Sequence, residues 1–182
     1  MEHRGRVYTI GHSNHTPEAF IALLRLHGIA TLVDVRSAPY SRFTTQFNKP
    51  DLQHLLTQNG IAYRYAGEFL GGRPTDPALY KSGEVPEGKA DYLHLVDYPA
   101  VARAEYFQRG LARLLEVAAE GPTTMMCSEE DPLQCHRHHL IARALEGHGV
   151  QVLHIRKSGE TEPFREETVV GVAPSPQQMG LF

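Results

Sequence analysis

Five short apolar runs recur along the first 156 residues, and polar residues follow closely after each run. The runs contain β-branched and other bulky side chains and are too short for typical helices, so they are characteristic of buried strands. The predicted strands cover residues 7–12, 30–35, 61–65, 122–127 and 150–155.

Apolar residues at helical spacing occupy most of the intervals between the predicted strands. Thr16 before Pro17 is a typical helix start, because the threonine side chain can cap the first N–H groups and proline suits the first turn. Asp51 and Asp131 are predicted to cap two later helices. The predicted helices cover residues 17–27, 52–60, 101–119 and 132–149.

Strands that alternate with helices predict an α/β fold. We expect a mostly parallel, five-stranded sheet with helices on both faces, which is a doubly wound three-layer architecture. In this prediction residues 1–156 form a single α/β domain, and residues 157–182 form a C-terminal tail. Residues 66–100 show little periodicity, and so long a connection is usually functional or contains small helices of its own.

The composition of the chain limits the classes of partner that it can bind. The 182 residues carry a formal net charge of −3, so binding to nucleic acid would need a local patch of positive charge. No apolar run is long enough to span a bilayer, and the first residues do not resemble a signal peptide. We therefore expect a cytoplasmic protein with no membrane partner, in which the two cysteines, Cys127 and Cys135, are thiols.

Polar residues with useful chemistry gather where the predicted strands end. Ligands bind at the carboxyl ends of the strands in open parallel sheets, so we expect these residues to share one site. The candidate catalytic residues are His12, Asp34, Cys127 and Glu129, and the candidate anion-binding residues are Ser13, Arg36, Arg42 and Arg137.

Asp34 and Arg36 lie one residue apart, so their side chains share a face of the predicted strand. Either Asp34 is a base and Arg36 an anion clamp, or the two form an ion pair that fixes a loop. The loop 36–49 contains three cations, three aromatic residues and no acid. This composition predicts contacts of the loop with phosphates and bases. The alternative is that Phe43 and Phe47 anchor the loop to the core.

Cys127 ends a predicted strand just before a helix, where a thiol can lose its proton easily, although a buried core thiol is the commoner case. Its spacing to Arg137 does not match the short Cys-to-Arg loop of phosphatases and sulfurtransferases. Cys135 and His136 are adjacent, and no two-residue Cys spacing is present, so we predict no metal and no cofactor. The other metal ligands that we considered are Glu129, His138 and His139.

Four groups of residues follow one another along the chain as short motifs. They are Ile10-Gly11-His12-Ser13, then Asp34-Val35-Arg36 with Pro39 and Ser41-Arg42, then Leu70-Gly71-Gly72, then Met126-Cys127-Ser128-Glu129 with Cys135-His136-Arg137. In content and order these motifs resemble the landmarks of the domain of unknown function 488 family, over roughly residues 7–156. The resemblance implies the fold and a shared site, and it implies no settled activity.

The predicted tail ends in Gln178-Met179-Gly180-Leu181-Phe182. This peptide resembles the Gln-Leu-x-Leu-Phe sequence by which bacterial proteins dock on the replication sliding clamp. In that role Gln178 would hydrogen-bond, Leu181 and Phe182 would fill an apolar pocket, and the polar linker before them would give reach. A bacterial sliding clamp is therefore a predicted partner, and packing of the apolar end against its own domain is the alternative.

The sequence favours an enzyme, a hydrolase or lyase, that acts on nucleic acid or a phosphate-bearing nucleotide in DNA maintenance and is tethered through its tail. In this hypothesis Asp34 and Glu129 do acid–base work, and His12 moves a proton. Two alternatives remain open. One is a non-enzymatic adaptor that binds nucleic acid, and the other is a thiol- or metal-dependent protein centred on Cys127 and Cys135.

Overall fold

A six-stranded sheet in the order β3-β2-β4-β1-β5-β6 lies at the centre of the computed structural model, which describes residues 5–166. All five predicted strands are confirmed and run parallel, and a sixth strand pairs antiparallel with β5. The strands are β1 (Arg6–Gly11), β2 (Thr31–Asp34), β3 (Ala62–Tyr65), β4 (Thr123–Cys127), β5 (Gln151–Ile155) and β6 (Thr161–Pro163).

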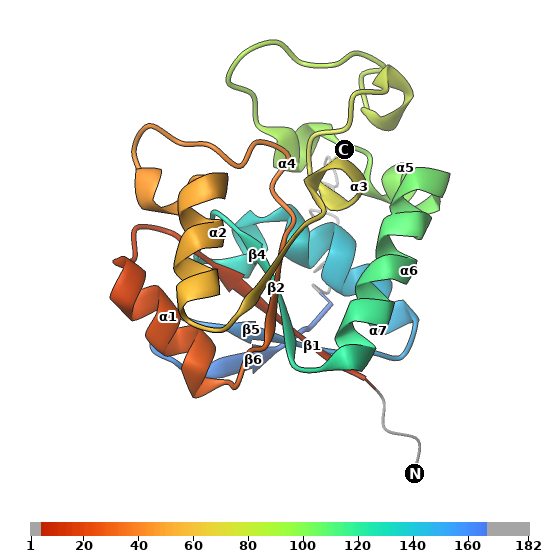
Figure 1. Ribbon diagram of the computed structural model, residues 1–182. Helices are drawn as coiled ribbons and strands as arrows, with labels where there is room; N and C mark the ends of the chain where they lie inside the picture. The colour runs from red at the N-terminus through yellow and green to blue at the C-terminus, as the bar shows by residue number, and fades with distance from the viewer. Residues whose placement is uncertain (1–4, 167–182) are drawn as a thin grey trace, which may run out of the picture.

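Helices cover both faces of the sheet. Figure 1 shows α1 (Pro17–Leu26) and α2 (Lys49–Gln58) on one side, and α6 (Glu105–Glu120) and α7 (Arg143–Gly147) on the other. Successive strand residues point to opposite faces, so the strands contribute apolar side chains to two separate cores. The predicted three-layer α/β architecture is therefore confirmed.

The helix starts follow local chemistry, with one difference from the prediction. The Thr16 side chain accepts a hydrogen bond of 3.2 Å from the backbone N–H of Ala19, as expected of a helix cap. The prediction that Asp51 caps the next helix is wrong, because that helix already begins at Lys49. Pro50 suits the first turn, and Asp51 lies within that turn, where a negative charge is favourable.

The segment predicted as one helix over residues 132–149 has three parts. It comprises the 3-10 turn η3 (Pro132–Gln134), the π-helix η4 (Arg137–Ala142) and α7. Asp131 caps η3 by accepting a hydrogen bond of 3.0 Å from the backbone N–H of Leu133. Apolar periodicity does not distinguish these helical forms, and π-helical turns are frequent at functional sites.

The long connection after β3 contains short helices and lies beyond the carboxyl ends of the strands (Figure 1). An isolated antiparallel bridge between Tyr80 and Val96 closes its largest loop. The helix predicted over residues 101–119 is two helices, because the chain breaks at Ala104. The short helices of this connection are α3 (Gly67–Leu70), η2 (Pro77–Leu79), α4 (Tyr92–Leu95) and α5 (Tyr98–Arg103). A further short helix, η1 (Thr45–Phe47), lies in the loop after β2.

The domain extends beyond residue 156, the predicted boundary, because β6 turns back to pair with β5. Backbone pairing rather than apolar content defines this strand, which is why the sequence pattern missed it. Residues 167–182, including the clamp-like peptide at 178–182, lie outside the described residues. Within residues 5–166 no helix is both long and apolar enough to cross a membrane.

Candidate functional site

A pocket of about 290 Å³ lies at the carboxyl ends of β2 and β4. Four segments that are distant in the chain form its walls: the loop after β2, the turn after α3, the segment from residue 90 to the start of α5, and the segment from β4 to η4. This is the edge of a parallel sheet at which ligands are expected to bind. The lining includes Arg36, Ser37, Gly72, Arg73, Tyr92, Tyr98, Cys127, Glu129, Cys135 and His136.

Two thiols and one imidazole meet at this pocket, and we call them the Cys–Cys–His cluster. The Nδ1 atom of His136 lies 3.7 Å from the Sγ atom of Cys127 and 3.7 Å from the Sγ atom of Cys135. All three side chains are buried, and these three atoms lie within 4.8 Å of one another. The turn after β4 therefore folds back and places Cys135 and His136 against the end of the strand.

The backbone holds the His136 ring in one orientation. Its Nε2 atom lies 3.2 Å from the carbonyl oxygen of Val35 and 3.1 Å from that of Leu70. Carbonyl oxygens only accept hydrogen bonds, so Nε2 carries the hydrogen and Nδ1 faces the sulfur atoms. Gly72 allows this packing, because a Cβ atom there would lie 2.6 Å from Cγ of His136.

The two thiols differ in their tendency to ionise. A hydrogen bond with Cys135 and burial raise the pKa of Cys127. Burial also opposes ionisation of Cys135, but the hydrogen bond with Cys127 and the positive charges of His136 and Arg137 lower the pKa of Cys135 well below its usual value. Burial would lower the pKa of His136, yet the neighbouring Cys135 raises it. The cluster therefore favours negative charge on one sulfur atom.

Glu129 also lines the pocket. Desolvation by the pocket walls and the neighbouring Cys135 raise the pKa of its carboxyl group, although the residue as a whole keeps exposed surface. A carboxyl group with a raised pKa can donate and accept a proton closer to neutral pH, which is the property of a general acid or base. Of the four predicted catalytic residues, Glu129 and Cys127 are the two that line the pocket.

Arg137 lies behind the pocket and is completely buried. Its Nε donates a hydrogen bond of 3.2 Å to the hydroxyl of Thr9, and its terminal nitrogens donate to the carbonyl oxygens of Glu129 and Glu130. Gly11 lets this segment approach β1, since a Cβ atom there would lie 1.7 Å from the carbonyl oxygen of Glu129. The predicted direct binding of an anion by Arg137 does not fit a side chain with no exposed surface.

A second buried cluster surrounds Asp34, and we call it the Asp34–Arg36 cluster. The two carboxylate oxygens of Asp34 accept hydrogen bonds of 2.9 Å and 2.7 Å from Nε and Nη2 of Arg36. The hydroxyl of Tyr63 donates to the same carboxylate at 2.9 Å, and Nη2 of Arg36 also reaches the carbonyl oxygen of Phe47 at 2.8 Å. Of the two interpretations of the sequence, the structure shows the ion pair that fixes a loop.

His12 belongs to the Asp34–Arg36 cluster as well. Its Nδ1 lies 2.9 Å from the carbonyl oxygen of Ser13 and must donate, so Nε2 can accept from Nη1 of Arg36, 3.3 Å away. Burial lowers the pKa of His12 to about 4, although the hydrogen bond to Ser13 opposes the change. Arg36 lines the pocket, whereas His12, Ser13 and Asp34 do not.

The loop after β2 presents two exposed aromatic rings. Tyr40 is 63% exposed and Phe43 is 79% exposed, while Phe47 is buried. The guanidinium of Arg42 lies 4.8 Å from the centre of the Phe43 ring. Phe47 therefore anchors the loop, as one interpretation expected, whereas Phe43 does not. Arg42 lies on this loop outside the pocket lining.

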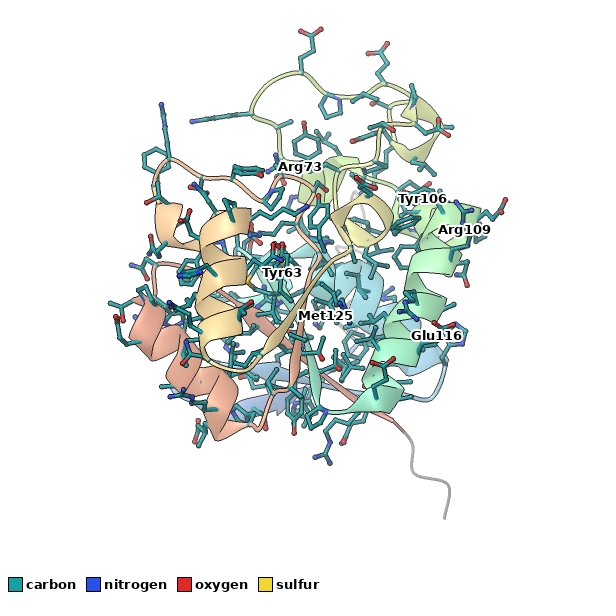
Figure 2. All side chains as sticks on the ribbon, in the orientation of Figure 1. Tyr63, Arg73, Tyr106, Arg109, Glu116 and Met125 are labelled. Carbon is teal, nitrogen blue, oxygen red and sulfur yellow. The ribbon has the colours of Figure 1, made fainter. Side chains whose placement is uncertain are left out.

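A second contact between an arginine and an aromatic ring lies at the pocket itself. The guanidinium of Arg73 is 4.7 Å from the centre of the Tyr92 ring, and both residues line the pocket. Figure 2 shows Arg73 on the side of the molecule where the strands end. The glycine pair before Arg73 belongs to one of the four motifs seen in the sequence. Tyr92 lies in the connection without periodicity and gave no signal.

The remaining histidines near η4 point away from the Cys–Cys–His cluster. Nδ1 of His138 lies 3.0 Å from Nε2 of His154, and Nε2 of His139 lies 2.7 Å from the carbonyl oxygen of Leu133. His154 in turn contacts the hydroxyl of Thr9 at 2.8 Å. Burial lowers the pKa of His154 to about 3. His138, His154 and Thr9 form a buried polar network, whereas His139 is only partly buried and lies outside it.

Comparison with known proteins identifies a family. Residues 16–144, more than half of the chain, match the family described as "Domain of unknown function DUF488". All residues that line the pocket lie within this range. No curated protein and no solved structure is similar enough to count as a match. The resemblance seen in the sequence motifs is thus confirmed, and the chain belongs to the DUF488 family.

Proposed function

We propose that the protein is an enzyme that acts on a nucleotide or a single strand of nucleic acid and that its chemistry takes place at the Cys–Cys–His cluster. One observation carries the proposal. A single pocket combines Cys127, Cys135 and His136 with Glu129 and with Arg73, which is stacked on an aromatic ring. Reactive groups beside a cation and an aromatic surface suit a substrate that has both a phosphate and a base.

Positive charge and aromatic rings on two sides of the pocket support the substrate class. Arg73 with Tyr92 lies in the wall, and Arg42 with Phe43 lies on the neighbouring loop, whose first residues also line the pocket. Bases stack on such rings, and guanidinium groups hold phosphate oxygens in two hydrogen bonds. The buried charge of Arg137 adds a positive field from behind.

The acid–base roles differ from those that the sequence favoured. Glu129 lines the pocket and has a raised pKa, so it suits proton transfer to or from the substrate. His136 directs Nδ1 at both thiols and can take up a thiol proton. The carboxylate of Asp34 is occupied by Arg36 and Tyr63, so Asp34 acts as a positioning residue for the loop after β2.

Substrate binding and turnover can be tested together. Purified protein is incubated with a mixture of nucleotides and short oligonucleotides, and products are identified by mass spectrometry. We expect Arg73→Ala to weaken substrate binding by about tenfold, because one good contact between a guanidinium and a phosphate is lost. Arg103→Ala is the matched control, because Arg103 is exposed on α5 and does not line the pocket.

The outcome also separates the enzyme from the adaptor. Binding that weakens with salt but yields no product would favour the non-enzymatic nucleic-acid-binding adaptor. Equal binding by Arg73→Ala and Arg103→Ala would contradict the proposed substrate site. Loss of binding in Arg73→Ala alone, with product formed by the other proteins, is the result that the proposal requires.

Docking on a bacterial sliding clamp, and with it a role in DNA maintenance, is a separate proposal that is supported by the sequence of residues 178–182 alone. Surface plasmon resonance against an immobilised clamp tests it directly. We expect the full chain to bind and a chain truncated after Gln177 not to bind. Equal responses from the two chains would remove the proposed tether without affecting the pocket.

A further inference from the structure

We infer that the Cys–Cys–His cluster binds a thiophilic divalent metal ion, with Zn²⁺ as the best fit, and that one coordination position is open to the pocket. The three ligand atoms would be Sγ of Cys127, Sγ of Cys135 and Nδ1 of His136. This inference relies on the proposed function only for what occupies the open position. The three ligands follow from the geometry of the cluster alone.

The spacing of the ligand atoms suits a tetrahedral ion. Zinc binds sulfur at about 2.3 Å and nitrogen at about 2.0–2.1 Å, so a tetrahedral angle places sulfur and nitrogen roughly 3.6 Å apart. Both distances from sulfur to Nδ1 of His136 are 3.7 Å, and all three atoms lie within 4.8 Å of one another. A bound ion would therefore require only small movements of side chains.

The groups around the cluster orient it as the surroundings of a metal site do. Metal-binding histidines commonly donate the other ring N–H to a carbonyl oxygen, which fixes the ring and its tautomer. Nε2 of His136 has two such acceptors, the carbonyl oxygens of Val35 and Leu70. The backbone N–H of Arg137 is 3.4 Å from Sγ of Cys135 and can stabilise a thiolate there.

The chemistry of the ligands selects the class of metal. Two thiolates and one imidazole favour zinc over Mg²⁺ or Ca²⁺, which prefer oxygen ligands. Three protein ligands beside an accessible pocket are typical of a site that keeps a position for water or substrate. The binding step balances as Zn²⁺ replacing the two thiol protons, which are released to the buffer.

The sequence indicates a metal at these residues only as an alternative, because the ligands are not spaced as in a zinc-binding motif. Cys127 ends β4, and Cys135 with His136 returns after η3, so tertiary structure brings the ligands together. His138 and His139 follow soon after Cys135 in the sequence, but they are not ligands of this site. His138 contacts His154, and His139 contacts the carbonyl oxygen of Leu133.

Metal content of the full-length protein tests the inference. After removal of metal with a chelator, Zn²⁺ is added, excess is dialysed away, and bound zinc is measured by plasma mass spectrometry. We expect one ion per chain for the wild type and for His148→Asn, an exposed-histidine control, and less than one tenth of that for Cys135→Ser and His136→Asn. Zinc retained by both cluster variants, or absent from the wild type, would overturn the inference.

Cobalt provides a readout that needs no variant to fold. Co²⁺ added to the metal-free wild type should produce absorption from charge transfer between sulfur and cobalt, because the chain has no cysteines other than Cys127 and Cys135. A spectrum without that absorption would overturn the site. Glu129→Gln should keep the metal, and loss of zinc from this variant would show a closed site with Glu129 as a fourth ligand.

The same variants distinguish failure of the metal site from failure of the proposed function. Arg73→Ala should bind one zinc ion while binding substrate weakly, because Arg73 is outside the ligand set. Full metal content in a protein that binds no nucleotide or oligonucleotide would contradict the proposed function and leave the metal site intact. Product formed equally by metal-free and zinc-loaded wild type would show that the reaction does not use the ion.

Discussion

Two buried polar clusters lie near one another at the carboxyl ends of the strands, and they differ in how completely their groups are paired. In the Asp34–Arg36 cluster the carboxylate accepts from a guanidinium and a tyrosine hydroxyl. In the Cys–Cys–His cluster two thiols share one imidazole nitrogen and face a pocket. The first cluster satisfies itself, and the second presents reactive atoms to a ligand.

This contrast separates the polar residues at strand ends that stabilise the fold from those that are available for chemistry. The two side chains of a buried ion pair with two hydrogen bonds have few hydrogen-bonding groups left for a substrate. Removal of one of them leaves the other as an uncompensated buried charge. A buried thiol beside an imidazole and an open pocket retains its reactivity. Changes in the first cluster should therefore alter stability, and changes in the second should alter binding and turnover.

Substitution in the Asp34–Arg36 cluster should cost the protein the most stability. Asp34→Asn should lower the free energy of unfolding by roughly 3–5 kcal/mol, because Arg36 would be left as a buried charge without its partner. Urea denaturation measures this loss. Asp51→Asn, at an exposed position in the first turn of α2, should cost no more than about 1 kcal/mol. Similar values for both variants would show that the ion pair does not support the fold.

Acidification should destabilise the protein through histidines that are buried in the neutral form. Burial lowers the pKa of His12 to about 4 and that of His154 to about 3. In the unfolded chain both take up protons near pH 6.5, so the unfolded state binds more protons below that value and stability is lost as the pH falls. Each residue should contribute a loss of about 2 kcal/mol between pH 7 and pH 5.

Urea denaturation at several pH values tests this dependence. His12→Asn should flatten the decrease in stability over that range, whatever the variant's stability at neutral pH. His148→Asn should leave the decrease as it is, because His148 is exposed. A wild type whose stability is constant from pH 7 to pH 5 would contradict the neutral, buried state of both residues.

Gly72→Ala should weaken the Cys–Cys–His cluster without changing any of its members. The new Cβ would lie 2.6 Å from Cγ of His136, so the ring must move away from its carbonyl partners. Loss of such support typically lowers metal affinity by about 10–100-fold, and competition with a zinc indicator measures that change. Gly147→Ala is the control, because no atom lies within 4 Å of a Cβ at Gly147.

A substitution on the exposed loop after β2 should have only a modest effect on binding. Arg42→Ala should weaken oligonucleotide binding by about fivefold and reduce the slope of log affinity against log salt by about one. Fluorescence anisotropy at several salt concentrations measures both. Stability should not change, because Arg42 is exposed. An unchanged salt slope would remove Arg42 from the proposed contact with phosphate.

The sheet could be predicted from the sequence because apolar runs such as Thr123–Cys127 carry their strand character locally. The strand order, β6 and the π-helix η4 could not, since they depend on pairing partners and on hydrogen bonds that leave no periodic pattern. Helix boundaries differ from the predicted ones where a proline allows the helix to begin earlier, as at Lys49. The pattern therefore predicted the elements and the three-layer architecture, but not the order of the strands in the sheet.

The candidate site could be predicted only in part. The rule that strand ends share a site correctly drew attention to Cys127, Glu129 and Arg36, which line one pocket. The rule could not tell that Arg137 would be completely buried against carbonyl oxygens, because that depends on how the turn after β4 folds back. Tyr92, from the connection without periodicity, was found only in the structure.

Product formation by matched variants shows whether the Cys–Cys–His cluster does the chemistry. Wild type, Cys135→Ser and Arg103→Ala are compared on the same mixture of nucleotides and oligonucleotides, with circular dichroism as a check of folding. We expect product from wild type and Arg103→Ala, and at least about a 100-fold loss of turnover in a folded Cys135→Ser protein, since a reactive group is removed. Turnover that Cys135→Ser retains in full would contradict the assignment of the chemistry to the Cys–Cys–His cluster.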